Sequence, residues 1–419
     1  MHYQASEAGP IKLVSGQGQY LYDANGERYL DCVNNVCHVG HCHPRIVTAA
    51  ATQLSMLNTN SRYMHDNIVR LAAEVAEVMP DPLSVCFFVN SGSEANDLAL
   101  RLARAYTNRR DVYCVREAYH GNSASTLAIS AYNKYAEVEA PDGSVVLTCP
   151  DAYREKKSAG DMTRYCVNEF DRLLSSRAES GNLPAAYIVE SLICCGGQVV
   201  LPPGYLPQMH ALARRNGALA IADEVQVGFG RIGSHYWCFE AHGAIPDIVT
   251  IGKPFGNGFP LAAVVTTSEI AEAARNVEYF NTFGGNPVAC AVGMEVLRVI
   301  EEEGLQQNAQ VVGEHTRAAM RSQVMAKHAS VVGDVRGMGL IFGVEFVSDV
   351  DTREPDADLA QHVMHHCRTH SNVLVSTDGP HRNVIKIKPP LCITMADGAA
   401  LVDAVDNAIA AYSGPRRMG

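Results

Sequence analysis

The chain lacks the features by which proteins engage membranes and nucleic acids. Its 419 residues contain no apolar run long enough to span a bilayer and no block of basic residues. The formal net charge is -11, so we expect neither nucleic acid nor membrane as a partner. An anionic ligand would need positive groups placed locally, against the sign of the whole chain.

Signals for export are also missing. The first residues, Met1-His-Tyr-Gln-Ala-Ser-Glu, include no basic segment followed by an apolar one, so no secretory signal is expected. The 13 cysteines are odd in number and scattered, and several lie inside apolar runs, such as Cys86, Cys114 and Cys290. This usage favours reduced thiols over a disulfide framework, and we expect a cytoplasmic protein.

Short apolar segments alternate with helical patterns through the first two thirds of the chain. Hydrophobic residues make up 47% of the sequence, which is ample for a large core and more than one domain. Repeated strand–helix units predict an α/β fold with a large, doubly wound and mainly parallel sheet. Strands are expected over residues 85–89, 111–115, 185–190, 219–222, 248–251 and 261–266.

The two ends of the chain differ from this pattern. The segment 16–26 alternates and then reaches Asp-Ala-Asn-Gly, which predicts a hairpin. A long helix over about 287–303 leads to a region where 344–347 and 384–387 alternate like strands, which indicates a smaller α/β C-terminal domain. We therefore expect an N-terminal segment (1–45) packing with the small domain, a large domain (46–290) and the small domain itself (291–419).

Two polar residues, Asp223 and Lys253, each come just after a short apolar run. Residues beyond the carboxyl ends of parallel strands face the ligand crevice, where a buried acid and a buried lysine are costly without partners or a cofactor. The carboxylate could keep a pyridine nitrogen protonated, and the amine could form a Schiff base with a cofactor aldehyde. For an isolated pair, a plain buried ion pair is the favoured interpretation.

Two further segments follow expected strands. Ser91-Gly-Ser-Glu-Ala opens a helix, so it is either a phosphate site or a simple Ser cap completed by Glu94. Tyr119 could stack on a flat ring or be an ordinary turn tyrosine. Each segment alone favours the plainer interpretation. Together with the acid and the lysine, all at the ends of strands, they point to one site.

These segments resemble the class III aminotransferases, a fold-type I family that depends on pyridoxal phosphate. The resemblance runs from Gly16 to about Ala410. The matching segments are Ser91-Gly-Ser-Glu-Ala, Tyr119-His-Gly, Asp223-Glu-Val-Gln-Val-Gly-Phe-Gly-Arg, Gly252-Lys-Pro and Asn281-Thr-Phe-Gly-Gly-Asn-Pro.

The resemblance implies a role for each matching residue. Lys253 would be the Schiff-base lysine and Asp223 the partner of the ring nitrogen, and these two are the expected catalytic residues. Thr282 would reach the cofactor phosphate of a neighbouring subunit, so a homodimer or a dimer of dimers with shared active sites is expected. The other implied cofactor-binding residues are Gly92, Ser93, Tyr119, His120, Glu190 and Gln226.

Two positions depart from the family pattern. Members that exchange two substrates hold an α-carboxylate with an arginine and cover that arginine with a glutamate gate. Here Cys195 stands at the place of the gate and Lys386 at the place of the arginine. Because a lysine offers a point charge instead of a planar fork, the paired change indicates that an α-keto acid is no longer handled.

Within that family the chain resembles the ethanolamine-phosphate phospho-lyases, in segments 34–44, 58–62, 195–198 and 378–384. The implied reaction eliminates phosphate from O-phosphoethanolamine to give acetaldehyde, ammonia and phosphate, with Lys253 taking the proton. The alternatives are an omega-aminotransferase using an amine donor and a keto acid, or a lyase for 5-phosphohydroxylysine. Candidate residues for the substrate phosphate are Arg62, His381, Arg382 and Lys386.

Two histidine-rich segments superficially suggest metal binding. The second lies at helical spacing and lacks the carboxylate-rich or paired-cysteine context of a metal site. The first falls in a loop that the family resemblance places near the substrate entrance, so we expect no metal in either. The presence of both Asp223 and Lys253 also argues against a non-catalytic cofactor-binding scaffold. The two segments contain His38, His41, Cys42 and His43, and then His362, His365, His366, Cys367 and His370.

Overall fold

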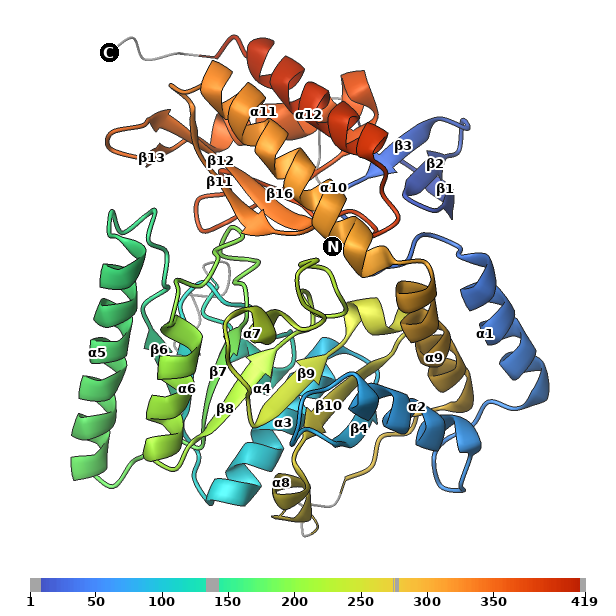
Figure 1. Cartoon of the computed structure of the whole chain (residues 1–419), viewed down its shortest axis with the longest axis vertical. Coiled ribbons are helices and arrows are strands. Elements are labelled where there is room, and N and C mark those ends of the chain that lie inside the picture. The colour runs from blue at the N-terminus through green and yellow to red at the C-terminus, as the bar shows by residue number, and fades with distance from the viewer. Residues whose placement is uncertain (1–8, 133–142, 274, 276–278, 415–419) are drawn as a thin grey trace.

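A seven-stranded sheet with its helices forms the lower tier of the molecule in Figure 1, and the C-terminal elements with the N-terminal strands form the upper tier. This computed structural model describes residues 9–132, 143–273, 275 and 279–414. In these ranges no helix combines the length and the apolar character needed to cross a bilayer.

The large sheet has the strand order β4-β10-β9-β8-β7-β5-β6. Only β10 runs against its neighbours β4 and β9, so the predicted mainly parallel, doubly wound sheet is confirmed. Strand β6 was missed by sequence reasoning because it is a short, half-buried edge strand. The strands are β4 (Val85–Val89), β5 (Val112–Val115), β6 (Ser144–Leu147), β7 (Ala186–Glu190), β8 (Leu219–Asp223), β9 (Ile248–Ile251) and β10 (Ala262–Thr266).

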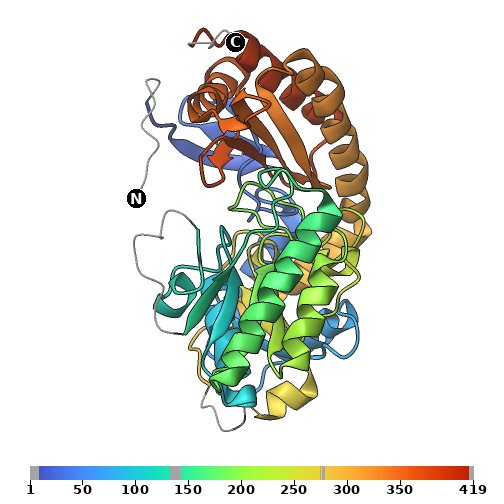
Figure 2. The ribbon, with the colours of Figure 1, turned by 90° about the vertical axis from the view of Figure 1, so that its left-hand side faces the viewer.

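The central strands are buried on both faces, which explains their continuous apolar runs. Ile221 belongs to the core under α3, and its neighbour Ala222 belongs to the core under α5 and α6. This alternation follows from the two-residue period of a strand. Figure 2 shows α5 and α6 in front of the sheet. The helices of this tier are α2 (Asp66–Glu77), α3 (Gly92–Thr107), α4 (Ala124–Leu127), α5 (Ala159–Glu179), α6 (Tyr205–Arg215), α7 (Cys238–Ala241) and α8 (Ser268–Ala273).

The N-terminal strands share a sheet with a strand from the C-terminal region. Strand β3 (Arg28–Asp31) pairs in parallel with β14 (Val373–Leu374) and antiparallel with β2 (Tyr20–Asp23), which in turn pairs with β1 (Leu13–Gln17). The expected Asp-Ala-Asn-Gly turn connects β2 to β3. Chain segments far apart in sequence are therefore joined within the upper tier (Figure 1).

A third sheet, ordered β11-β12-β16-β15 with β13 on β12, lies at the centre of the upper tier. Helix α9 (Pro287–Glu302) contacts α1 (Pro44–Met56) and α2, and leads to this tier. The domain boundary expected between residues 290 and 291 falls inside α9, and the expected division of the chain stays a prediction. The remaining elements are α10 (Leu305–Ala319), β11 (Val332–Met338), β12 (Ile341–Asp349), β13 (Glu354–Pro355), α11 (Ala357–Ser371), β15 (Ser376–Asp378), β16 (Val384–Ile387) and α12 (Met395–Ala410).

Candidate active site

A cavity of about 400 Å³ lies at the carboxyl ends of the parallel strands. This is the place where open α/β sheets bind ligands, and the volume is in the range of small-molecule sites. Among the residues implied by the family resemblance, those that line the cavity are Gly92, Ser93, Tyr119, His120, Glu190, Asp223, Gln226 and Lys253.

The first wall of the cavity is the start of α3. Ser91 caps this helix, because its Oγ accepts a hydrogen bond from the amide of Glu94 at 3.2 Å. The Glu94 carboxylate accepts the amide of Asn90 at 2.8 Å and not that of the cap residue itself. The Ser cap is therefore present, but Glu94 does not complete it as a capping box. Gly92 and Ser93 nevertheless face the cavity, and a Cβ at Gly92 would lie 2.7 Å from Val225. Glycine therefore keeps open a cradle at a helix N-terminus, which suits an anion.

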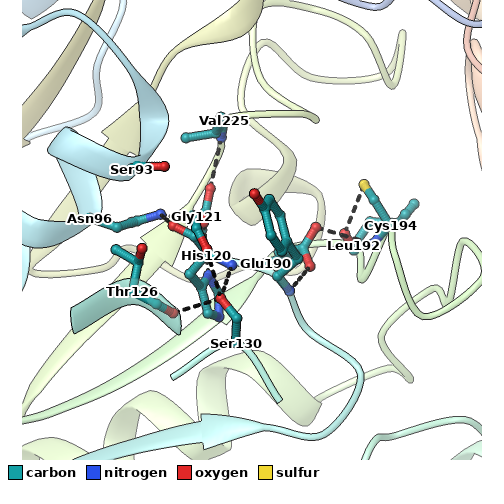
Figure 3. Close-up of polar contacts among 12 residues, drawn as sticks. Ser93, Asn96, His120, Gly121, Thr126, Ser130, Glu190, Leu192, Cys194 and Val225 are labelled. Carbon is teal, nitrogen blue, oxygen red and sulfur yellow. Dashed lines mark hydrogen bonds and ion pairs between the residues drawn. The ribbon is translucent and has the colours of Figure 1, made fainter. Parts of the chain in front are cut away.

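Asp223 is buried under the cavity and is hydrogen-bonded on both oxygens. Figure 3 shows Asn96, His120 and Val225, the residues that bond to it. Its Oδ2 accepts Nδ2 of Asn96 at 2.8 Å and pairs with Nδ1 of His120 at 2.8 Å. Its Oδ1 accepts the amide of Val225 at 3.0 Å. Burial opposes ionisation, but the bond and charge of His120 and the other donors outweigh it, so the pKa of Asp223 lies below its ordinary value. A buried carboxylate is thus kept anionic at the cavity. Sequence reasoning did not find Asn96, which lies inside a helix without a motif of its own.

Lys253 follows β9 and opens a short 3-10 helix, Lys253–Gly256. Its backbone φ is +30°, a conformation that costs energy for a residue other than glycine and is common at functional sites. Within the described ranges the ion-pair partner of Asp223 is His120, not Lys253. The simple buried Asp–Lys pair that the sequence left open is therefore not formed.

Glu190, the last residue of β7, forms hydrogen bonds both to Tyr119 and to the loop that follows β7. Its carboxylate accepts the amide of Tyr119 at 3.0 Å and the amide of Cys194 at 3.1 Å. Figure 3 shows Glu190 beside Cys194. Burial, and then the charge of Asp223, raise the pKa of Glu190 to about 7. Glu190 thus positions the backbone of Tyr119 without contributing a full negative charge.

Gln226 is linked to a buried lysine that sequence reasoning did not single out. Nδ2 of Asn35 donates to Oε1 of Gln226 at 3.2 Å, and Nζ of Lys388 donates to Oδ1 of Asn35 at 3.1 Å. Burial, and then the charges of Lys386 and Lys253, lower the pKa of Lys388 to about 7. The alternation Lys-Ile-Lys at the end of β16, with a buried isoleucine between, was the available sequence signal.

The four candidates for the substrate phosphate lie outside the described lining of the cavity. Arg62 is exposed, with its guanidinium 5.3 Å from the ring centroid of Phe280. His381 and Arg382 are exposed in the turn between β15 and β16. Lys386 is ion-paired with Asp378. None of the four is among the described residues that line the cavity, and their role stays a prediction. Thr282 is also exposed and lies outside the cavity of its own chain.

The histidine-rich segments have structural partners. His38 lies between the carbonyl of Phe229 (2.7 Å) and the guanidinium of Arg231 (3.0 Å), and His41 pairs with Asp31 at 2.7 Å. On α11 the rings of two histidines stack on one another. Over the residues that the structure describes, no three His, Cys, Asp or Glu side chains gather as a candidate metal site.

The chain belongs to the class III aminotransferase family, whose model matches residues 3–409. An alanine–glyoxylate aminotransferase 2-like protein of Drosophila melanogaster is 50% identical over 392 residues, which cover 91% of this chain and 79% of that protein. An ethanolamine-phosphate phospho-lyase homolog of Caenorhabditis elegans is 41% identical over 418 residues, with 96% and 88% coverage. A phospholyase from Arthrobacter, solved in complex with phosphoethanolamine, superposes with a TM-score of 0.91 at 35% identity and covers 98% of this chain and 96% of its own.

The cofactor of this family is pyridoxal phosphate, as predicted from the sequence. The cavity fits it, since it offers an open glycine cradle at Gly92, a carboxylate held ionised at Asp223 and the amine of Lys253. The protein is therefore an enzyme of a family that contains both aminotransferases and phospho-lyases acting on small molecules.

Proposed function

We propose that this enzyme is a phospho-lyase that eliminates phosphate from O-phosphoethanolamine to give acetaldehyde, ammonia and phosphate. The observation that carries the proposal is Cys195, in the loop after β7 where an exchange enzyme needs a movable acid. Burial, and then the charge of Asp378, raise the pKa of this thiol to about 12, so it stays neutral and cannot act as a gate. The likeness to the Arthrobacter phospholyase, solved in complex with phosphoethanolamine, supports the same substrate.

Several residues of the chain would each have a separate role in such an elimination. Bound pyridoxal phosphate supplies an electron sink for the charge left when the carbon bearing nitrogen loses a proton. Gly92 and Ser93 would hold its phosphate, Tyr119 its ring face and Gln226 its ring hydroxyl, while Asp223, kept anionic by His120, would hold the proton on the ring nitrogen. Glu190 would support Tyr119.

Lys253 would act as the base of the reaction. Its Nζ takes the proton from the carbon bearing nitrogen, and the carbon–oxygen bond to the phosphate on the adjacent carbon then breaks, with the electron pair leaving on the phosphate. Water then hydrolyses the released product to acetaldehyde and ammonia. No oxidant, reductant or keto acid enters this balance.

We also propose that the enzyme is a homodimer with shared active sites. The segment between α1 and α2 leaves Tyr63 85% and Met64 95% exposed, and Phe280 and Phe283 next to Thr282 are exposed as well. Clustered exposed apolar side chains of this size are typical of subunit interfaces. Thr282, outside the cavity of its own chain, would then serve the site of the partner.

An omega-aminotransferase is the second candidate, because the Drosophila relative at 50% identity is named as an aminotransferase. The deciding experiment supplies holoenzyme with phosphoethanolamine and no keto acid. Equal release of phosphate and acetaldehyde, abolished by Lys253→Ala, is the expected result. Absence of phosphate release, together with amino transfer from an amine to pyruvate, would overturn the lyase proposal.

A further inference from the structure

A chain of hydrogen bonds connects the buried Lys388 to Gln226 in the wall of the cavity. Nζ of Lys388 donates to Oδ1 of Asn35 at 3.1 Å, and Nδ2 of Asn35 donates to Oε1 of Gln226 at 3.2 Å. Gln226 lines the cavity together with Asp223 and Lys253, whereas Asn35 and Lys388 are not among its described lining residues. The three linked side chains are buried and come from three separate regions of the sequence. The tertiary fold therefore builds this chain of contacts behind one cavity residue.

The lysine fixes the direction of this chain. A protonated amine has three donors and no acceptor, so the amide of Asn35 turns its oxygen toward Lys388 and its nitrogen toward Gln226. Oε1 of Gln226 is then occupied as an acceptor. The other polar atom of this side chain, Nε2, bonds to none of the described residues and is the end that Gln226 can offer to a ligand in the cavity. Reversing either amide would place two donors or two acceptors face to face.

A lysine is a costly residue to keep at this place. Lys388 is only 8% exposed, and among the described residues its amine bonds to Asn35 and to no carboxylate. Burying an amine without an opposite charge costs stability, which an apolar side chain of similar length would not. Proteins depart from an apolar interior in this way chiefly at functional sites. The position of Lys388, two hydrogen bonds from the cavity wall, indicates such a role.

We propose that Lys388 and Asn35 are positioning residues that make Gln226 present its amide nitrogen to the cavity. This wall of the cavity then offers a hydrogen-bond donor, and a bound group must place an acceptor there. The inference rests on the proposed contact between Gln226 and the ring hydroxyl of pyridoxal phosphate. A donor at that oxygen favours its ionised form over its neutral form. Lys388 would thus affect the bound cofactor without touching it.

The analogue of pyridoxal phosphate that lacks the ring hydroxyl provides the matched probe. Competition of the two compounds for the full-length apoenzyme gives the ratio of their affinities, and the wild type should prefer pyridoxal phosphate at least about tenfold. The measurement is made at about pH 6, below the pKa of Lys388 of about 7, so that its amine is protonated.

The variant Asn35→Asp reverses the direction of the chain with almost no change of shape. Its carboxylate still accepts from Lys388 but cannot donate to Gln226, whose amide would turn its oxygen toward the cavity. The preference for pyridoxal phosphate should fall about tenfold. Lys388→Met should move the ratio in the same direction, because nothing then holds the amide of Asn35. Lys327→Met, at a lysine paired with Asp406 far along the chain, is the control and should leave the ratio unchanged.

A double variant separates positioning from a general loosening of the site. Gln226→Met should remove the preference, and adding Lys388→Met should change the ratio no further, because the effect of Lys388 passes through Gln226. A merely structural role would weaken the binding of both compounds equally and leave the ratio as it is in the wild type.

Two results would overturn the inference. One is a wild type that binds both compounds equally, and the other is an unchanged ratio in Asn35→Asp and Lys388→Met. If Asn35→Asp does not fold, the ratio in Lys388→Met decides. The lyase proposal is tested separately by phosphate release. Its failure would leave the competition between the two cofactors unaffected, because that competition involves no substrate.

Discussion

The ionisation of Asp223 depends on donors that a local motif does not reveal. The strand pattern placed an acid at the end of 219–222, and the acid is there. What keeps it anionic comes from α3 and from the residue after Tyr119, through Asn96 and His120. Residue types at strand ends were therefore predictable from sequence, whereas their partners were not, because those partners meet only through the order of strands in the sheet.

Removing the imidazole of His120 should change the pH dependence of the reaction. His120→Ala removes the hydrogen bond and the charge that favour the ionised form of Asp223. Burial would then raise the pKa of this carboxyl. A carboxylate with a depressed pKa is lost as the pH falls through that value, so the acid limb of kcat should move to higher pH. We expect a loss of about tenfold in kcat at neutral pH. An unmoved acid limb would contradict this role. His235→Ala, at an exposed position, is the control.

Lys388 carries a cost in stability with a defined pH window. Its pKa falls from an ordinary 10.5 to about 7 on burial, so the unfolded chain binds more protons between these values and stability rises with pH there. Lys388→Met should therefore stabilise the protein by about 1–3 kcal/mol below pH 7, with the gain vanishing above about pH 10.5. Thermal unfolding across pH measures this. Lys386→Met, which leaves Asp378 unpaired, should destabilise instead.

At the scale of elements, hydrophobic pattern and strand ends agreed closely with the structure. The expected strands 85–89 and 248–251 have the bounds of β4 and β9. The reversed direction of β10 was not predictable, because direction follows from which neighbours a strand pairs with and not from its own apolar run. Its reversal brings Leu261, directly before β10, to the cavity.

The first turn of α3 should not tolerate a side chain at Gly92. In Gly92→Ala the new Cβ would meet Val225 at 2.7 Å, so the cradle would narrow or its wall would shift. We expect pyridoxal phosphate to bind about tenfold more weakly, with little change in Tm. Gly160→Ala is a matched control at the start of α5, where nothing lies within 4 Å of the added Cβ. If both variants bind pyridoxal phosphate with equal affinity, Gly92 is not needed to keep the phosphate cradle open.

At the scale of the whole molecule, the described residues that line the cavity all come from one chain. Thr282, which the family resemblance implies at the cofactor phosphate, is not among them. Thr282 and the neighbouring Phe283 are exposed, while Asn281 is tied to Asn90 at the cavity rim by a 2.9 Å hydrogen bond. The loop is therefore anchored beside one cavity and presents its next residues outward. Only the family resemblance indicated this outward position of Thr282, because the proposed sharing depends on a surface between two copies that no local pattern in one chain reveals.

Mixing two inactive variants tests whether the sites are shared. Lys253→Ala removes the proposed base, and Thr282→Asp would set a carboxylate against the cofactor phosphate that Thr282 is proposed to contact. If Thr282 serves the partner's site, a mixed dimer has one site with an intact lysine and an intact threonine. Random re-association of equal amounts should then restore about a quarter of wild-type activity, since half of the dimers are mixed and half of their sites are complete. If Thr282 serves its own chain, every site keeps a defect and mixing restores nothing.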